Sequence, residues 1–251
     1  MVSGLVRRDL RVRYAGSFLG IAWTVLQPLL QLLVYVVVFS VILQVKFTAG
    51  GGSGNFALYL LVGLLPWMAF QEGVTKAATA VVEHAALVKG SCFPAAVLVA
   101  SSVLASIINL LAGLAVLLLV LLATGHLWWS GLLFLPLLVC LQTALALGLG
   151  LVMASLYTFL RDTLPVLQIG FMIWFYLTPI IYPLAYVPQQ LTPLFACNPL
   201  TSVVTAYRAA LLEGVVPAAS DFLLPLAWTV VSVLLGSVMF TRVEPGFADV
   251  L

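Results

Sequence analysis

The chain has 251 residues, of which 64% are hydrophobic and only 7% charged, and its mean hydropathy is +1.22. A soluble domain carries about 25% charged residues, so a chain this poor in charge could not cover a soluble globule with polar surface. The net charge of +2 is small and dispersed, which argues against nucleic-acid binding. The composition therefore predicts an integral membrane protein.

The chain begins with a concentration of positive charge. The segment "LVRRDLRVRYAGSFLG" at 5–20 holds four of the ten Lys and Arg residues, namely Arg7, Arg8, Arg11 and Arg13. Three of these arginines share one side of a helical wheel, which predicts an amphipathic helix at the membrane interface over residues 3–15. Arg13 lies off that stripe, so a charged tail with no fixed helix is the alternative. The apolar run that follows is too long for a cleavable signal peptide.

The charges divide the rest of the chain into apolar blocks at 14–45, 47–71, 90–160, 163–207 and 222–241. A spanning helix needs roughly 20 apolar residues, and the third block is long enough for two. The segment "TGHLWWSG" at 124–131 separates these two, with Trp128 and Trp129 as an interfacial anchor. The predicted fold is an all-α integral membrane protein, one transmembrane domain over 1–251 with six spans at 18–44, 56–76, 94–123, 131–159, 164–183 and 222–241.

The distribution of basic residues predicts the orientation in the membrane. With the N-terminus inside, eight basic residues fall on the cytoplasmic side and two, Lys46 and Arg208, on the outer side. We therefore expect both termini in the cytoplasm. The cytoplasmic set is Arg7, Arg8, Arg11, Arg13, Lys76, Lys89, Arg161 and Arg242.

Residues 72–94 form the first long cytoplasmic connection. Glu72 and Lys76 are four residues apart and can pair on one helix face, so we expect the second span to continue past the membrane. Gly90 and Pro94 end this helical region and leave a short helix around Glu83–Lys89. This helix is either the polar tip of a hairpin or a docking site for a cytosolic partner. The other cytoplasmic connection, "LRDT" at 160–163, is predicted to be a solvated turn.

The outer connection over 182–221, with its helices expected at 184–220, is long and mostly apolar, but prolines at 183, 188, 193 and 199 prevent a continuous span. Asn198 or Thr201 can start a short helix that runs to about Leu212 and ends at Gly214. Irregular backbone at membrane depth survives only against protein or water. We therefore expect a re-entrant or interfacial pair of helices that covers a cavity.

Several kinds of chemistry are missing from the sequence. No G-x-x-x-x-G-K-[ST] phosphate loop is present, and His84 and His126 lie far apart on opposite sides of the predicted membrane. No carboxylate falls in the middle of a span, which argues against a proton- or sodium-driven pump. We expect no cofactor or metal to be bound by this chain.

Aromatic residues are abundant in two of the predicted spans. A flat sugar face can stack on such rings, and weak stacking would let a long glycan slide. We therefore predict an aromatic, uncharged substrate path, although packing or lipid contact would explain the same rings. The predicted path residues are Tyr35, Phe39, Phe171, Trp174 and Phe175.

Taken in order, the motifs resemble a known family. They are "RRDLRVRYAGSFLGIAWTVLQPLLQLLVYVVVF", "GLLPWMAF", "LVKGSCFPAAVL", "LRDTLPVLQ", "LTPIIYPLAYVP", "NPLTSVVTAYRAALLEG" and "EPGFADVL". Together they resemble the transmembrane subunit of type-2 ABC exporters, in the branch that exports O-antigen, capsule and teichoic-acid polysaccharides. The likeness runs from about Leu5 to Leu251. One departure is "KGSCFP", since relatives usually carry a bulkier or basic residue near Gly90 and Ser91.

This resemblance implies partners and a cellular location. Such subunits form homodimers in the bacterial cytoplasmic membrane and bind two copies of a separate ATPase, which holds ATP and Mg²⁺. The substrate would be a lipid-linked polysaccharide, and the path would run along the dimer axis. The opening arginines would lie in the family's interface helix, and 184–220 would hold the outer gate helices. The ATPase-coupling residues would be Glu83, His84, Leu87, Lys89 and Phe93 in the coupling helix region 83–93, with Arg161 and Asp162 in a second contact.

Two other functions stay open at the level of sequence. An exporter of small amphiphiles or drugs would share the same architecture. A membrane-embedded scaffold or enzyme is the third possibility, and an enzyme should show a cluster of polar or acidic residues at one membrane face, which the sequence lacks. The identity of the glycan and the type of cell envelope are not encoded in any motif.

Overall fold

The computed structural model describes residues 56–90, 94–215 and 218–251, together with isolated positions between 22 and 42. Within the ranges that it describes, every regular element is helical and no strand occurs. Four of these helical segments are long and apolar enough to cross a membrane, which makes the chain a multi-pass membrane protein. The predicted interface helix 3–15 and most of the predicted span 18–44 lie outside the described residues. The four segments are Phe56–Glu83, Ala96–Ala123, Trp129–Phe159 and Asp221–Gly246.

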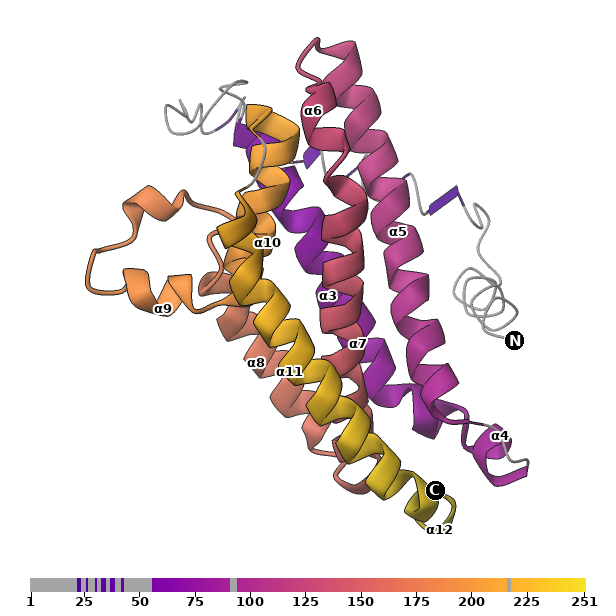
Figure 1. Ribbon diagram of the computed structural model, residues 1–251. Coiled ribbons are helices and arrows are strands. Elements are labelled where there is room, and N and C mark those ends of the chain that lie inside the picture. The colour runs from indigo at the N-terminus through magenta and orange to yellow at the C-terminus, as the bar shows by residue number, and fades with distance from the viewer. Residues whose placement is uncertain are drawn as a thin grey trace.

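Helix α3 (Phe56–Glu83) occupies the centre of the bundle (Figure 1). Helices α5 (Ala96–Ala123) and α7 (Leu135–Phe159) pack against it along much of its length, and α11 (Ala219–Val243) packs on α7. Small buried residues of α3, among them Ala57, Ala77 and Ala78, allow its neighbours to approach closely. The core of the protein is therefore built around α3, whereas α11 keeps one apolar face exposed.

The segment that follows the predicted span 56–76 is helical as well. Helix α3 continues to Glu83, and Glu72 and Lys76 form the expected ion pair with 3.4 Å between Oε1 and Nζ. A turn at His84 separates α3 from the short helix α4 (Ala85–Gly90). This separation agrees with the short helix expected before the Gly90 and Pro94 breaks.

The fourth span begins differently from the prediction of one helix over 131–159. A short helix α6 (Trp129–Leu132) comes first, and α7 starts at Leu135 because Pro136 favours the first turn of a new helix. Helix α6 packs against residues 209–213, and Ser130 Oγ donates to the Gly214 carbonyl over 3.1 Å. Gly214 has a φ of +64° and lies so close to the Trp128 ring that a side chain would not fit there.

The fifth apolar segment is shorter than the predicted span 164–183. Helix α8 (Thr163–Tyr176) has 14 residues, which corresponds to roughly 21 Å against the roughly 30 Å of a hydrocarbon core. It ends early because Pro179 has no N–H and disfavours helical geometry at Thr178. The Thr178 hydroxyl instead donates to the Trp174 carbonyl over 2.9 Å.

Two helical pieces follow α8. A short turn η3 (Leu184–Tyr186) and helix α9 (Thr192–Ala196) project to one side of the bundle (Figure 1). Helix α10 (Pro199–Arg208) then runs back along α3, α7 and α11, and it continues as the π-helical turn η4 (Ala209–Glu213). Asn198 is the N-cap of α10 and Gly214 ends η4, as the sequence predicted.

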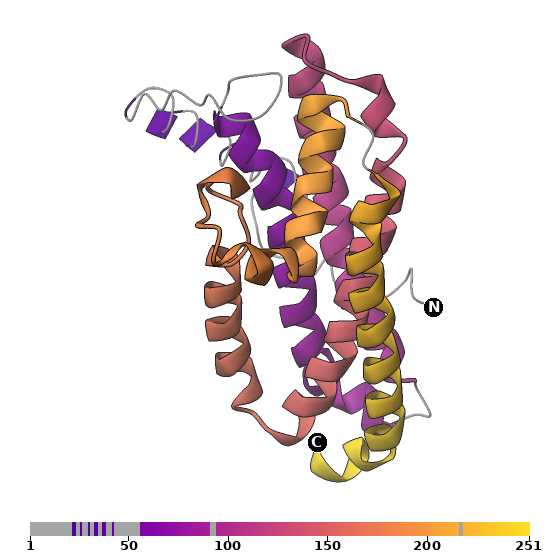
Figure 2. The same cartoon turned by 60° about the vertical axis from the view of Figure 1, so that its left-hand side comes forward.

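The C-terminal end of the chain lies at the same end of the bundle as α4. Helix α11 covers Ala219–Val243, slightly more than the predicted 222–241, and η5 (Glu244–Gly246) and α12 (Phe247–Val250) follow it. Helix α12 contacts both α4 and α7. The connection between α7 and α8 reaches this same end, as Figure 2 shows.

Candidate functional site

Asn198 joins the end of α8 to the start of α10 at a buried junction. Its Oδ1 accepts from Trp174 Nε1 over 2.8 Å and from the Leu200 backbone N–H over 3.0 Å. Its Nδ2 donates to the Leu177 carbonyl and to Thr178 Oγ1, over 3.0 and 2.9 Å. One amide group therefore satisfies the broken end of one helix and caps the beginning of the next.

Arg208 holds the same junction from the other end of α10. Its side chain is 5% exposed, and its Nη1 and Nη2 donate to the Pro179 and Ile180 carbonyls over 2.6 and 2.7 Å. The guanidinium lies 3.5 Å from the centre of the Tyr59 ring on α3, which stabilises the cation through the ring face. Gly63 leaves the necessary room, since a Cβ at Gly63 would lie 2.8 Å from Arg208 Nη2.

The structure adds a second feature to Arg208. The charge pattern predicts that it is one of two basic residues on the outer side, and the structure shows that its side chain is buried and bonded to backbone. Within the described ranges, no carboxylate lies within 4.0 Å of it. Burying an arginine among apolar residues costs free energy, and the hydrogen bonds to the two carbonyls offset part of this cost. Arg208 in turn supplies donors to the backbone carbonyls beyond the end of α8.

The aromatic residues predicted for the substrate path on α8 pack inward against α3. Phe171 is 2% exposed and meets Trp67 and Phe70 edge to face, with ring centres 6.1 Å apart in both pairs. Trp174 and Phe175 are half-buried and also meet Trp67, at 6.2 and 5.6 Å. Edge-to-face pairs of this kind stabilise helix packing. Phe171 thus reaches no open surface here, while the role of all three rings in a path stays a prediction.

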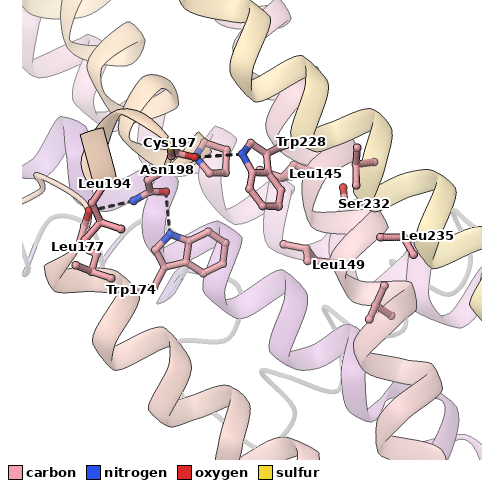
Figure 3. Close-up of a pocket in the computed structure, with 13 residues that line it drawn as sticks. Leu145, Leu149, Trp174, Leu177, Leu194, Cys197, Asn198, Trp228, Ser232 and Leu235 are labelled. Carbon is pink, nitrogen blue, oxygen red and sulfur yellow. Dashed lines mark hydrogen bonds between the residues drawn. The ribbon is translucent and has the colours of Figure 1, made fainter. Parts of the chain in front are cut away.

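An apolar groove of about 450 Å³ lies beside this junction, between α7, α8, α11 and the start of α10 (Figure 3). Its two tryptophans use their N–H groups internally, Trp174 to Asn198 and Trp228 to the Cys197 carbonyl over 3.1 Å. The walls therefore offer hydrocarbon and ring faces rather than free donors. The other residues that define the groove include Leu145, Leu149, Leu194, Val231, Ser232 and Leu235.

The described residues predicted for ATPase coupling lie at the end of the bundle that holds α4, α12 and the connection between α7 and α8 (Figures 1 and 2). His84 and Leu87 are half-buried, and Arg161 lies 5.2 Å from the centre of the Tyr157 ring. The exposed members of the set are Glu83, Lys89, Arg161 and Asp162. The described residues of the two predicted contacts therefore share one end of the bundle, and their role in binding an ATPase stays a prediction.

Some predicted site residues lie outside the described part of the chain. They are Arg7, Arg8, Arg11, Arg13, Tyr35, Phe39 and Phe93. Within the part that is described, His, Cys, Asp and Glu side chains form no group of three that could hold a metal ion.

Sequence reasoning missed three residues of these sites. Arg208 stands out in hindsight as a lone charge between apolar segments, and Tyr59 gave no signal of its own. The third is Glu244, whose Oε1 accepts from the Ala95 backbone N–H over 2.9 Å. The two residues of this last contact are 149 positions apart, so no local pattern could have revealed it.

Comparison with known proteins agrees with this architecture. Residues 2–212 match the model of the family described as ABC-2 type transporter. The chain is 33% identical over 253 residues to an O-antigen export system permease protein, RfbA, of Myxococcus xanthus, covering 99% of this chain and 94% of that protein. It is 27% identical to an RfbA of Klebsiella pneumoniae, over 98% and 93% of the two chains.

The name of a further relative refers to a different polymer. The polysialic acid transport protein KpsM of Escherichia coli is 24% identical, over 97% of this chain and 93% of that protein. All three relatives thus match along nearly their whole length. Because the family model covers most of the chain and the helices form the multi-pass membrane bundle described above, this protein belongs to the ABC-2 type transporter family.

Proposed function

We propose that this chain is the membrane-spanning permease subunit of an ATP-driven exporter that moves a lipid-linked polysaccharide across the bacterial cytoplasmic membrane. The observation that carries the proposal is the end-to-end match to proteins named as O-antigen export permeases, one of them 33% identical. A polysialic acid transport protein matches over a similar length, which supports polysaccharide as the substrate class.

The working assembly that we propose is a homodimer with two ATPase subunits. ATP and Mg²⁺ would be held by those partners, and this chain would bind neither. The end of the bundle that holds α4 and the 160–162 turn would dock on the ATPase, because Glu83, Lys89, Arg161 and Asp162 are exposed there. We keep the predicted orientation, with both termini in the cytoplasm and residues 3–15 lying at the inner interface. Six spans are kept only if α8 and α10 together form the fifth.

The outer connection would form the gate at the opposite side of the membrane. Helix α8 is too short to cross alone, and α10 with η4 continues along the bundle after the sideways excursion through α9. The Asn198 and Arg208 junction would keep this broken segment in register against α3. Because α8 and α10 are two separate helices, the gate could open and close without unfolding a full span.

The apolar groove beside the junction suits the hydrocarbon part of the substrate. Its walls are carbon and ring faces, and Trp174, a predicted path residue, forms part of them. Its volume falls within the roughly 300–1,000 Å³ of typical ligand sites. The glycan itself would travel along the dimer axis, where the predicted rings Tyr35 and Phe39 of the first span would lie.

Loss of the gene tests the proposed function directly. Cells that lack this subunit should accumulate lipid-linked polysaccharide inside the cytoplasmic membrane and lose it from the surface, and the intact gene should restore export. The measurement is polysaccharide on whole cells compared with that in lysed cells. Unchanged surface polysaccharide, together with a new sensitivity to amphiphilic drugs, would instead indicate an exporter of small molecules.

A bulky substitution tests the groove. Leu149→Trp should fill part of it and lower polysaccharide export several-fold while the dimer and the ATPase complex stay intact. Leu137→Trp is the matched control, because Leu137 is exposed on the same helix and outside the groove. Equal export by the two variants, at the wild-type rate, would exclude the groove as a substrate site.

A further inference from the structure

The C-terminal segment 244–251 connects the two cytoplasmic elements that the proposed function assigns to ATPase contact. Helix α12 contacts both α4 and α7. Phe247 is fully buried, and its ring lies 5.3 Å from that of Phe240 and 6.0 Å from that of Phe159. Because Phe159 directly precedes the 160–162 turn, the segment is fastened close to both elements.

Glu244 makes the most specific contact of this segment. Its carboxylate accepts from the backbone N–H of Ala95, which is 1% exposed and stands at the start of α5. Ala95 is the N-cap residue of α5, and the N–H groups at the start of a helix have no partner from the regular helical pattern. Glu244 therefore supplies the partner of the Ala95 N–H from a distant part of the chain. Its negative charge also suits the positive end of the 28-residue helix α5.

The position of this contact gives it a mechanical consequence. Ala95 lies five residues after Gly90, where α4 ends, and α4 itself contacts α12. A force applied to α4 would therefore reach segment 244–251 through α12, and α5 through the bond from Ala95 to Glu244. With Glu244 in place, the start of α5 is also tied to η5, α12 and the end of α11.

We propose that Glu244 is a positioning residue for energy coupling, and that segment 244–251 links α4 and the 160–162 turn into one unit that moves with the ATPase. This inference rests on the proposed function for its partner. Segment 244–251 itself need not touch the ATPase. Its role is to transmit movement at α4 to α5 and to the end of α7 together.

Hydrogen–deuterium exchange of the purified permease tests the structural half without any ATPase. Glu244→Ala should raise the exchange rate of the Ala95 amide about 10-fold and increase exchange across α4. Glu244→Gln keeps an acceptor oxygen and should restore most of the protection. Asp249→Ala is the matched control, because it removes an exposed carboxylate from α12. Exchange at Ala95 that is unchanged in Glu244→Ala would overturn the proposal.

Coupling is tested in the complete complex with its ATPase. We expect Glu244→Ala to keep the ATPase bound and hydrolysing ATP but to lower polysaccharide export per ATP at least 5-fold, with Glu244→Gln in between and Asp249→Ala at the wild-type level. Wild-type export per ATP in Glu244→Ala would overturn the proposal. If the wild-type complex exported no polysaccharide at all, the proposed function would fail, while the exchange experiment would still decide whether Glu244 positions α5 and α4.

Discussion

At the α8–α10 junction and at the end of the bundle that holds α4 and α12, side chains bond to backbone groups in different surroundings. At the junction, Asn198 and Arg208 are buried and bond to the carbonyls of a broken helix. At the α4–α12 end, half-buried Glu244 makes one bond to a helix start. Both supply partners to backbone groups that a regular helix leaves unpaired.

The difference lies in what can replace the side chain when it is lost. Glu244 is only half-buried, so water can replace a missing carboxylate there, and we expect its loss to change the position of α4 more than the stability of the bundle. Within the apolar bundle no solvent can take over, and an unpaired carbonyl costs its full desolvation penalty. We therefore expect variants at the junction to fail in folding and variants at the α4–α12 end to fail in coupling.

Arg208→Met should give the largest effect and test this comparison most strongly. It leaves the Pro179 and Ile180 carbonyls without their donors, at about 1–3 kcal/mol for each buried group, and removes the contact with Tyr59. Arg208→Lys should recover only part of the loss, because an ammonium lacks the planar fork of the guanidinium. The free energy of unfolding in detergent is the measurement. A stable, well-assembled Arg208→Met protein would show that the junction does not depend on this cation.

Asn198→Ala should have an intermediate effect. The variant loses the cap of α10, worth about 1 kcal/mol, and leaves the indole N–H of Trp174 and the Leu177 carbonyl unpaired. Thermal unfolding of the purified protein measures the change. Thr192→Ala is the control, since its exposed hydroxyl makes only a long 3.4 Å bond to the Pro188 carbonyl. If the two variants unfolded at the same temperature, Asn198 would not hold the junction.

Gln142→Leu should change the free energy of unfolding least of the three. It tests whether a buried polar residue outside the junction matters as much as those within it. Gln142 is fully buried, and its Nε2 donates to the Pro66 carbonyl over 2.9 Å, but its Oε1 has no hydrogen-bond partner among the described residues. Leucine would lose one bond and also remove an unsatisfied oxygen, so the two changes offset each other to within about 1 kcal/mol. A loss as large as that of Arg208→Met would mean that Gln142 belongs to the essential polar set.

Much of the architecture follows from local features of the sequence. Uncharged blocks predicted the helices that became α3, α5, α7 and α11, because hydropathy over about 20 residues decides membrane insertion. Of the two predicted helix starts, Asn198 rather than Thr201 begins the α10–η4 segment, and Gly214 ends it as predicted. The i,i+4 spacing of Glu72 and Lys76 predicted an ion pair that the structure contains.

The tertiary structure alone decided where α8 stops and what the polar residues near it do. Pro179 is visible in the sequence, yet the early end of α8 is completed by Asn198 and Arg208, which lie about 20 and 30 residues further along. The inward packing of Phe171 and the bond from Ala95 to Glu244 likewise depend on how distant helices meet. Local propensity acts over a few turns, whereas these contacts exist only once the bundle has packed, because only then do distant segments lose water and need one another's polar groups.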